Sequence, residues 1–485
     1  MTILIRELLQ GLGATIELSV AGIAVGGVVF RSDQVSKGDV FFCVPGFVND
    51  GHDFAADAVA RGASAIVCER HIPEAAGVPQ IIVKDTRAAL ARAAAVFRRY
   101  PSHELDLVGI TGTNGKTTTT YLLDSILRAA GHVTGLIGTV ETRIAAERFD
   151  AGRTTPESAD LQELLRSMRD AGVTAVSMEV SSHAIDLHRV DALRFAVAAF
   201  TNLTQDHLDY HHTIEEYFAV KRRLFTDFEV GSRVVNIDDL HGAAIAVEID
   251  GVLTVGRASD AMIRAVDEEL LPDSAMFTLS TPAGSASVHL PLAAEYNVSN
   301  ALVAAGCGFA LGIDVETIAE GLSSAPQVPG RLERIEAGQP FGVFVDYAHT
   351  PDSLEKAIGA VRDITPGRVL AVFGCGGDRD PDKRPLMGTA AAGAADHVII
   401  TSDNPRSENP VGIILQVEDG ARAVGGSYEV IVDRRAAIAA AIDQAAPGDA
   451  VLIAGKGHED YQIFADRTIH FDDREVATEE VARRC

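Results

Sequence analysis

Short runs of apolar residues alternate with segments of helical periodicity through most of the chain, a pattern typical of α/β architecture. Within the first hundred residues this pattern predicts a small α/β unit with strands at residues 28–30, 40–44, 65–68 and 81–83. Tyr100, Pro101 and Ser102 follow the last helical pattern of this unit and indicate a boundary. We therefore expect a first domain over residues 1–102.

A second unit, expected over residues 103–328, begins with a strand at residues 105–110. In its later part, residues 234–292 carry short alternating segments, and two structures remain open for them: an inserted β region, or loops. A helical pattern at residues 298–311 is expected to close the unit, because Pro326 breaks the pattern shortly after it.

The third unit, expected over residues 329–485, is predicted to have strands at residues 341–345, 369–373, 397–401 and 450–453. Each of these strands is followed directly by polar, glycine-rich or charged residues. In open parallel sheets, ligands bind just beyond the carboxyl ends of the strands. We therefore expect a Rossmann-like domain with a binding site at that edge.

The most informative segment is GITGTNGKTT at residues 109–118, which lies between an apolar strand and a helical pattern. Its glycines allow the backbone to wrap closely around phosphate groups and to direct N–H groups towards them. Lys116 would supply a positive charge to the β- and γ-phosphates, and the Thr117 hydroxyl would face Mg²⁺. The spacing departs from the strict pattern G-x-x-x-x-G-K-[ST], so TGTNGKT is a variant. It predicts a central nucleotide-binding domain with a parallel sheet, but it does not identify the reaction.

Acidic and imidazole groups follow two further apolar runs. Glu179 ends the predicted strand at residues 175–179, where a carboxylate can bind Mg²⁺; a solvated strand-end glutamate is an equally good interpretation. Residues 201–211 combine acids and histidines, but they lack a cysteine partner and HExxH spacing, which disfavours zinc. Carboxylates beside a nucleotide favour a hard cation instead. A single histidine such as His207 is more often structural, so the local pattern assigns it no role.

Lys221 has an unusual position for a lysine. The helical pattern at residues 215–228 puts it on the apolar face of the helix, which also carries Tyr217, Leu224 and Phe225. One explanation is that its aliphatic stem packs on apolar surface while its ammonium group reaches water. The other is that burial depresses the pKa of the amine, so that the neutral amine becomes available for covalent modification.

The formal net charge of −26 limits the partners that we expect. A surface this acidic repels phosphate backbones, so nucleic acid is not an expected partner. The cysteines are scattered without a CxxC pair, which favours reduced thiols in the cytosol. They are Cys43, Cys68, Cys307, Cys375 and Cys485. No run approaches the roughly 20 apolar residues that a membrane span requires, so we expect no membrane partner either.

Eleven segments of the chain together resemble the Mur ligases, in the order in which that family carries them. They are TGTNGKTTT, TTPES, MEVSSHA, TNLTQDHLDYH, YFAVKRRLF, YNVSNAL, VPGRLE, VDYAHTPDSL, FGCGGDRD, SDNPRSENP and GKGHEDYQ. They span nearly the whole chain, and the match is closest to the members that add diaminopimelate. The resemblance implies an N-terminal domain for a UDP-linked precursor, a central ATPase domain and a C-terminal domain for the acceptor amino acid.

The resemblance also implies ATP as co-substrate. The ATP-binding residues that it implies are Gly112, Thr113, Asn114, Gly115, Lys116, Thr117, Thr118, Asn300, Arg331 and Asp346. The implied catalytic residues are Lys116, Glu179, His207 and Lys221. Two Mg²⁺ ions would be held by Thr117, Glu179, His207 and Lys221, the last as a carbamylated lysine. Carbamylation accounts for the inward-facing lysine better than an ammonium group that reaches water.

Two further residue sets are implied for the other substrates. The UDP-muramoyl-dipeptide would contact Ser32, Thr154, Thr155, Ser181 and Arg189. Diaminopimelate would contact Arg379, Asp403, Asn404, Pro405, Arg406, Gly455 and Glu459. Diaminopimelate carries a second carboxylate that lysine lacks, and Arg406 can bind a carboxylate through two parallel hydrogen bonds. Near the uridine site, family members often carry Asp-Ser-Arg, whereas here Arg31 and Asp33 reverse the charges around Ser32.

The function implied is that of a monomeric cytoplasmic enzyme that adds meso-2,6-diaminopimelate to UDP-N-acetylmuramoyl-L-alanyl-D-glutamate through an acyl phosphate. It would serve peptidoglycan synthesis and cell wall biogenesis, and with them cell shape, cell division and the cell cycle. A lysine-adding Mur ligase and a folylpolyglutamate synthetase are alternatives, distinguished by their acceptors. A nucleotide-dependent switch or DNA motor is disfavoured by the acidic charge and the acceptor segments. A precursor-binding protein without activity would leave the phosphate and metal groups unused.

Overall fold

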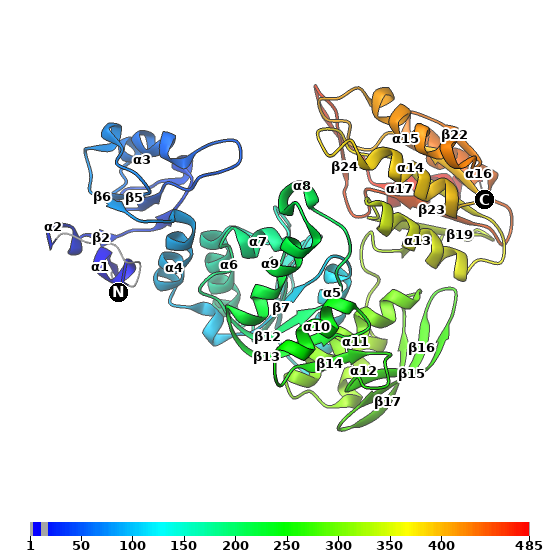
Figure 1. The fold of residues 1–485 in the computed structure, drawn as a ribbon, viewed down its shortest axis with the longest axis horizontal. Coiled ribbons are helices and arrows are strands. Elements are labelled where there is room, and N and C mark those ends of the chain that lie inside the picture. Colours follow the sequence, from blue (N-terminus) through cyan, green and yellow to red (C-terminus); the bar gives the residue numbers. More distant parts are fainter. Residues whose placement is uncertain (1–2, 11–17, 485) are drawn as a thin grey trace.

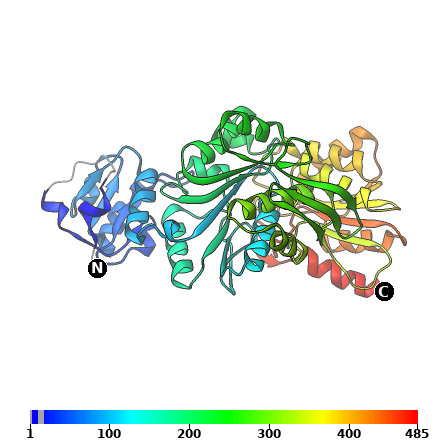
Figure 2. The same cartoon turned by 90° about the horizontal axis from the view of Figure 1, so that it is seen from below.

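The computed structural model describes residues 3–10 and 18–484, and it contains three α/β domains arranged in a row (Figures 1 and 2). The N-terminal domain, in blue, lies at one end, and the C-terminal domain, in yellow to red, lies at the other. The prediction of three α/β domains is confirmed. Among the described residues, no helix is both long and apolar enough to cross a membrane. The four cysteines within the described part are all buried and free, and Cys485 lies outside it.

The N-terminal domain is built on a parallel sheet with the strand order β3-β4-β5-β6. Its strands are β3 (Val28–Val29), β4 (Val40–Phe42), β5 (Ala65–Cys68) and β6 (Gln80–Ile82), with an antiparallel pair of β1 (Ile3–Leu4) and β2 (Ala24–Val25) beside them. The helices are α1 (Ile5–Leu8), α2 (Leu18–Ala21), α3 (Ala55–Arg61) and α4 (Thr86–Arg98), and the short 3₁₀ turns are η1 (Ser32–Gln34), η2 (Gly51–Phe54), η3 (Pro73–Ala75) and η4 (Pro101–Glu104). Separate apolar clusters cover the two faces of the sheet, one under α1 and α4 and the other under α3.

The central domain contains one large mixed sheet, with the strand order β10-β9-β8-β11-β7-β12-β13-β14-β15-β16-β17. The strands are β7 (Asp106–Thr111), β8 (Thr134–Ile137), β9 (Glu141–Ile144), β10 (Glu147–Asp150), β11 (Ala175–Glu179), β12 (Arg194–Phe200), β13 (Glu229–Asn236), β14 (Leu253–Gly256), β15 (Ile263–Leu270), β16 (Ala275–Thr281) and β17 (Gly284–Leu290). The strands from β8 to β15 in this order are parallel, as predicted. At both edges the sheet adds antiparallel strands to this parallel centre: β9, β10, β16 and β17 run antiparallel because tight turns connect them to their neighbours.

The segment at residues 234–292, which the sequence left open, forms strands rather than loops. After β13, the strands β14 to β17 continue the same sheet instead of building a separate insertion. The helix predicted at residues 298–311 is α11 (Glu295–Ala310), which begins three residues earlier than predicted. It does not close the domain, because α12 (Val315–Ser323) follows it, with the Asp314 side chain accepting a hydrogen bond from the backbone N–H of Thr317.

Helices cover both faces of the central sheet. Those not yet named are α5 (Lys116–Ala129), α6 (Ser158–Asp170), α7 (Ser182–Asp186), α8 (Leu208–His211), α9 (Ile214–Thr226) and α10 (Leu240–Glu248). The helices α5, α11 and α12 share one apolar cluster with the sheet, and α6, α7, α9 and α10 share another on the opposite face. Because helices shield both faces, the central strand β7 is buried from Leu107 to Thr111, and the loop that follows its carboxyl end lines a cavity.

The C-terminal domain has a sheet with the strand order β18-β19-β23-β20-β21-β22, parallel except for the edge strand β18. The strands are β18 (Glu333–Arg334), β19 (Gly342–Asp346), β20 (Val369–Phe373), β21 (His397–Ile400), β22 (Tyr428–Val430) and β23 (Ala450–Ala454), and a hairpin of β24 (Tyr461–Ile463) and β25 (Thr468–His470) follows. The helices α13 (Pro351–Asp363), α14 (Lys383–Ala394) and α15 (Pro410–Val424) cover one face, and α16 (Arg434–Gln444) and α17 (Asp473–Arg484) cover the other. This doubly covered parallel sheet is the Rossmann-like arrangement that was predicted.

Candidate active site

A phosphate loop connects β7 to α5, and two of its glycines are required by close contacts. A Cβ atom on Gly112 would lie 1.9 Å from the Thr201 hydroxyl oxygen, and one on Gly115 would lie 2.2 Å from the Asn300 side-chain oxygen. Both glycines also have positive φ angles, of 144° and 86°. Asn202 fixes the loop between them, since its side-chain oxygen accepts a hydrogen bond from the Asn114 backbone N–H at 3.0 Å.

Lys116 is the first residue of α5, and its ammonium group lies inside the loop. Its Nζ donates to the carbonyl oxygens of Gly112 at 3.0 Å and Thr113 at 2.7 Å. Burial lowers the pKa of this amine, while the nearby carboxylates of Glu179 and Asp206 act in the opposite direction. Because its acceptors are carbonyls of its own loop, the ammonium group sits where phosphate oxygens can compete for the same protons.

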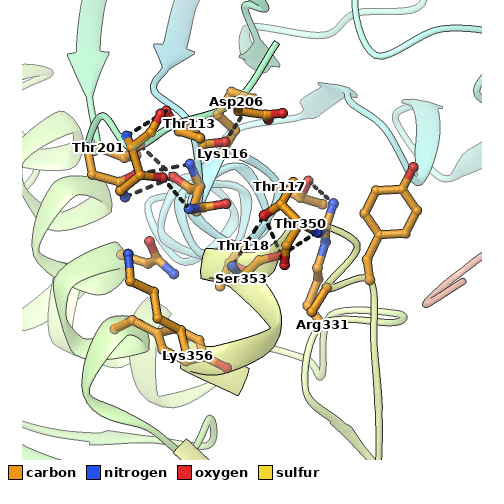
Figure 3. Close-up of a pocket in the computed structure, with 18 of the residues that line it drawn as sticks. Thr113, Lys116, Thr117, Thr118, Thr201, Asp206, Arg331, Thr350, Ser353 and Lys356 are labelled. Atoms are coloured by element: carbon orange, nitrogen blue, oxygen red, sulfur yellow. Dashed lines mark hydrogen bonds between the residues drawn. The ribbon is translucent and has the colours of Figure 1, made fainter. Parts of the chain in front are cut away.

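The loop lines a cavity of about 490 Å³ between the central and C-terminal domains. Figure 3 shows Arg331 reaching across this cavity from the C-terminal side, and its Nη2 donates to the Thr117 hydroxyl at 3.0 Å. The predicted residues that line the cavity are Thr113, Asn114, Gly115, Lys116, Thr117, Thr118, Thr154, Glu179, Ser181, His207, Asn300, Arg331 and Asp346. The predicted residues that do not line it are Ser32, Gly112, Thr155, Arg189, Lys221, Arg379, Asp403, Asn404, Pro405, Arg406, Gly455 and Glu459.

Glu179 ends β11 and is only 1% exposed, so its interpretation as a solvated strand-end glutamate is wrong. Its Oε1 accepts the Thr139 backbone N–H at 2.7 Å, and its Oε2 accepts the Thr139 hydroxyl at 3.1 Å. Thr154 and Thr155 lie against the same strand end: the Thr154 hydroxyl is 3.0 Å from that of Thr139, and the Thr155 hydroxyl donates to the Glu179 carbonyl at 2.8 Å. Ser181 follows directly and caps α7.

His207 lines the cavity and has a left-handed backbone conformation, with a φ of 52°. Its ring packs edge-on against that of His183, with a distance of 5.0 Å between centroids. Burial lowers the pKa of His207 to about 4, in spite of the Asp206 carboxylate nearby, so the imidazole is neutral at neutral pH. A neutral imidazole is the form that can bind a metal ion.

Lys221 is buried in α9, together with the other three residues of the predicted apolar face. The side chain is 1% exposed, so the explanation in which its ammonium reaches water is wrong. Its Nζ donates to the Gly112 carbonyl at 2.7 Å and lies 4.4 Å from the centre of the Tyr217 ring. Burial first, and the Lys116 charge second, lower the pKa of this amine well below its ordinary value. The site therefore favours a neutral amine directly behind the phosphate loop.

The polar side chains that line the cavity include oxygen and nitrogen donors that suit a metal ion bound jointly with phosphate oxygens. Among the described residues, no group of three or more His, Cys, Asp or Glu side chains is arranged to hold a metal ion. Mg²⁺ is commonly bound through one or two protein ligands together with phosphate oxygens and water. Thr117, Glu179 and His207 line one cavity and offer an oxygen, a carboxylate and a neutral imidazole for such binding.

The C-terminal side of the cavity is formed by β19 and the start of α13. The Asp346 carboxylate holds the chain before and after it, because its oxygens accept the backbone N–H groups of Leu332 at 2.6 Å and Ala348 at 2.8 Å. Arg331 stacks on the Tyr347 ring, with its guanidinium carbon 4.7 Å from the ring centre. Burial raises the pKa of Asp346, and the Arg331 charge opposes this effect.

Several cavity residues were not singled out from the sequence. They are Asn202, Thr204, Asp206, Tyr296, Tyr347, His349, Thr350, Ser353 and Lys356. Of these, Figure 3 labels Asp206, Thr350, Ser353 and Lys356. All of them except Lys356 fall within segments that were already recognised as family-like, such as VDYAHTPDSL. For Thr350, Ser353 and Lys356, the signal that could have found them is the start of α13, where a Thr350 cap and Pro351 begin the helix.

The residues predicted to bind the acceptor gather at the carboxyl ends of β21 and β23. The Asn404 side-chain nitrogen donates to Glu459 Oε2 at 2.8 Å, and a Cβ on Gly455 would lie 2.8 Å from Asp403 Oδ2. A Cβ on Gly376 would lie 2.9 Å from Arg406 Nη1 and 3.9 Å from Arg379 Cγ, so both arginines flank the same turn.

The turn that contains Pro405 and Arg406 packs closely against Gly377. A Cβ atom on Gly377 would lie 1.9 Å from the Pro405 carbonyl oxygen. Arg406 has a left-handed φ of 53° and donates from Nη1 to the Gly377 carbonyl at 2.8 Å. A left-handed arginine is uncommon and is typical of functional turns. The arginine is thus held in place by the chain on both sides.

Ser32 and Arg189, predicted for the UDP-linked precursor, lie away from the cavity. Ser32 begins η1, and the charges on either side of it neutralise each other through an Arg31–Asp33 ion pair of 2.9 Å. Arg189 pairs with Glu157 at 3.0 Å, and Glu157 also pairs with Arg87 of the N-terminal domain at 3.2 Å. Arg189 is therefore located where the N-terminal and central domains meet.

The chain was compared with known families and structures. Family models match three stretches: the Mur ligase family catalytic domain matches residues 24–98, the Mur ligase middle domain residues 110–308, and the Mur ligase glutamate ligase domain residues 330–457. The UDP-N-acetylmuramoyl-L-alanyl-D-glutamate–2,6-diaminopimelate ligase of Geobacillus kaustophilus is 48% identical over 468 residues, which cover 93% of this chain and 94% of that protein.

Solved structures agree with the sequence match. A structure of UDP-N-acetylmuramoyl-L-alanyl-D-glutamate–2,6-diaminopimelate ligase has a TM-score of 0.71 and 31% identity, and covers 100% of this chain and 99% of that chain. The MurF ligase of Thermotoga maritima in complex with ADP has the same fold, with a TM-score of 0.64 at 21% identity over 94% of this chain and 96% of that one. With nearly its whole length matched in this way, the chain belongs to the Mur ligase family, as its ordered segments predicted.

Proposed function

We propose that the chain is an ATP-dependent ligase that joins meso-2,6-diaminopimelate to the D-glutamate of UDP-N-acetylmuramoyl-L-alanyl-D-glutamate. It would act as a cytoplasmic monomer in peptidoglycan precursor synthesis, and so contribute to cell wall biogenesis, cell shape and division. The observation that carries the proposal is the cavity between two domains, where Lys116 and Arg331 face each other across the phosphate loop. The high identity to a relative named for this reaction supports the choice of substrates.

The proposed reaction has two steps. The γ-carboxylate oxygen of the D-glutamate residue attacks the γ-phosphorus of ATP, the bond from that phosphorus to the β–γ bridging oxygen breaks, and ADP leaves. The diaminopimelate amine then attacks the acyl carbon of the resulting acyl phosphate, phosphate leaves, and the nitrogen loses a proton. Lys116 would offset the negative charge that otherwise keeps the carboxylate and the triphosphate apart.

The two Mg²⁺ ions of the proposal would be held by Thr117, Glu179, His207 and Lys221. When bound, they supply positive charge against the phosphate oxygens. The neutral Lys221 amine favoured by burial is the form that can react with CO₂. Its nitrogen would bond to the CO₂ carbon and lose a proton, which turns a cationic side chain into a carboxylate-like one.

Arg406 is the residue proposed to distinguish diaminopimelate from lysine. Within the guanidinium group only Nη1 donates to a described residue, the Gly377 carbonyl, so Nε and Nη2 remain as a pair of parallel donors. Such a pair matches the two oxygens of a carboxylate, which diaminopimelate has on its second centre and lysine lacks. Asp403 and Glu459 supply negative charge for an ammonium group at the same edge of the sheet.

The proposal is tested by acceptor-dependent release of ADP from ATP in the presence of the UDP-muramoyl-dipeptide. We expect meso-diaminopimelate to stimulate release, and lysine to give a kcat/KM roughly 10- to 100-fold lower, the value of one lost hydrogen-bonded charge pair. The Arg406→Ala variant should lose most of this discrimination. Equal rates with diaminopimelate, lysine and glutamate, or release that no amine stimulates, would contradict the proposal.

A second expected result concerns Arg331, which links the C-terminal domain to the phosphate loop. Replacing Arg331 by alanine removes the hydrogen bond to Thr117 and the stacking on Tyr347, and should raise the KM for ATP by roughly 10- to 100-fold. The matched control is Arg334→Ala, because Arg334 pairs only with Asp273 and Glu336 at the surface. Steady-state kinetics with ATP as the varied substrate compare the two, and similar KM values for both variants would refute the role of Arg331.

A further inference from the structure

Lys456 follows β23 and is a fully buried lysine, with 0% exposure, that none of the roles above uses. An ammonium group has three protons to donate. Here the three acceptors are the Tyr461 carbonyl oxygen, Glu459 Oε2 at 3.3 Å and Asn404 Oδ1 at 3.5 Å. All three protons are therefore taken by the protein itself, and none is left for a bound molecule.

The contact with Asn404 decides which way its amide group points. Asn404 Oδ1 accepts the Ile463 backbone N–H at 3.0 Å as well as the Lys456 ammonium. With the oxygen held by two donors, the nitrogen must point the other way, and it donates to Glu459 Oε2 at 2.8 Å. The side chain can turn over only if Lys456 and the β24 backbone lose their acceptor.

The contact with Glu459 decides which of its oxygens is available. Its Oε2 receives both the Asn404 amide and the Lys456 ammonium, whereas Oε1 has no hydrogen bond with any described residue. Glu459 thus presents one free carboxylate oxygen at the edge of the sheet, in a fixed direction. A single free anionic oxygen beside an oriented amide is suited to an ammonium group.

We propose that Lys456 is a positioning residue for the acceptor, which holds Asn404 and Glu459 in the orientation that binds the ammonium group of the incoming amino acid. This inference rests on the proposed ligase function. Lys456 does not touch the acceptor and acts only through its two neighbours. The Lys456 charge also lowers the pKa of the Glu459 carboxylate, which a purely space-filling residue would not do.

The Lys456 charge acts on the pKa of Glu459, and a purely structural role of Lys456 would not have this effect. Burial raises the pKa of Glu459, and the Lys456 charge and the Asn404 hydrogen bond oppose it, while the Asp403 charge adds to the rise. The other groups that face Glu459 are the hydroxyls of Tyr347 and Tyr461 and the guanidinium of Arg434. Without the Lys456 charge, the Glu459 pKa rises further, and the carboxylate becomes protonated at a higher pH.

The test uses Lys456→Met, which keeps the side-chain length and removes the charge. With ATP and the UDP-muramoyl-dipeptide saturating, we expect the KM for diaminopimelate to rise roughly 10- to 100-fold, the effect of one hydrogen bond to a charged group, with the KM for ATP unchanged. The acidic limb of kcat/KM for the acceptor should move to higher pH. Arg435→Met, which removes a surface cation of α16 paired with Glu479, is the matched control and should change neither value.

A double substitution tests whether Lys456 acts through Glu459. In a Glu459→Gln background, Lys456→Met should have little further effect on the acceptor KM, because the carboxylate it supports is absent. If Lys456→Met does not fold, Lys456→Gln, which retains N–H donors without the charge, should show the same shift of the pH limb. An unchanged acceptor KM and pH profile in a folded variant would overturn the role of Lys456. Failure of the unmodified chain to respond to diaminopimelate would instead overturn the proposed function.

Discussion

Substitution of Lys116 by methionine is expected to lower the rate of ATP-driven ligation by roughly 10³- to 10⁵-fold, in the range of other cations that stabilise phosphoryl transfer. Methionine preserves the aliphatic stem but removes the Nζ that now donates to the Gly112 and Thr113 carbonyls. Because Lys116 lines the cavity directly beside the loop carbonyls, its loss removes a cation from the proposed phosphate site. The triphosphate and the attacking carboxylate would then repel each other without compensation.

The rate of ADP release under saturating substrates measures this effect, and Lys84→Met is its matched control, because Lys84 is an exposed lysine of the N-terminal domain. Binding of ATP should weaken much less than the rate falls, since the backbone N–H groups of the loop remain. A folded Lys116→Met protein that keeps more than about a tenth of the unsubstituted rate would rule out this role for Lys116, because a single lost hydrogen bond already costs about tenfold.

Local sequence patterns were sufficient to predict the structure where a single segment determines its own geometry. In the loop at residues 109–118, a side chain at Gly112 would collide with Thr201, and one at Gly115 would collide with Asn300. The loop can therefore adopt this conformation only with glycine at these two positions. The position of Lys221 on the apolar face of its helix followed from helical spacing, but the spacing alone did not decide whether its amine is buried or reaches water. The ordered family-like segments then gave the three-domain α/β fold.

Features that join distant segments were not predictable in the same way. Residues 234–292 read equally well as strands or loops, because pairing with β13 on one side supplies the hydrogen bonds that decide between them. The Arg331 contact with Thr117 joins positions 214 residues apart, and no local pattern encodes it. Likewise Lys456 and two of its acceptors, Glu459 and Tyr461, stand within one recognised segment, but the third acceptor, Asn404, lies 52 residues away.

The position of the acceptor residues relative to the phosphate loop was also not predictable from local patterns, because it depends on how the domains are arranged. Asp403 and Arg406 come together with Glu459 because parallel strands bring their carboxyl ends to one edge. They do not line the cavity that contains Lys116. The reaction proposed here therefore requires the C-terminal domain to bring its edge towards the phosphate loop, as closing domains do in enzymes that exclude water from reactive intermediates.

The substitution Lys221→Ala is expected to lower ligation by about 10³-fold, comparable to the loss of one preorganised charge-stabilising group. The proposed reason is that the chain needs a carboxylate at this position and makes it from a neutral amine and CO₂. Burial and the nearby Lys116 charge lower the pKa of the amine, and among the described residues its hydrogen-bond acceptor is the Gly112 carbonyl of the phosphate loop. Alanine removes the amine and leaves a small space beside the loop.

Added short carboxylates distinguish a missing carboxylate from a damaged fold. Acetate or propionate can occupy the space beside Gly112 in the Lys221→Ala protein and should restore part of the rate, in proportion to their concentration. They should not restore the Lys116→Met protein, which lacks a cation instead. The modification itself is measured by NMR of the unsubstituted chain equilibrated with isotopically labelled CO₂, where a carbamate signal should be present and should be lost in Lys221→Ala. A Lys221→Ala protein with undiminished ligation would show that the buried amine serves packing alone, since removal of a required carboxylate leaves the phosphate charge uncompensated.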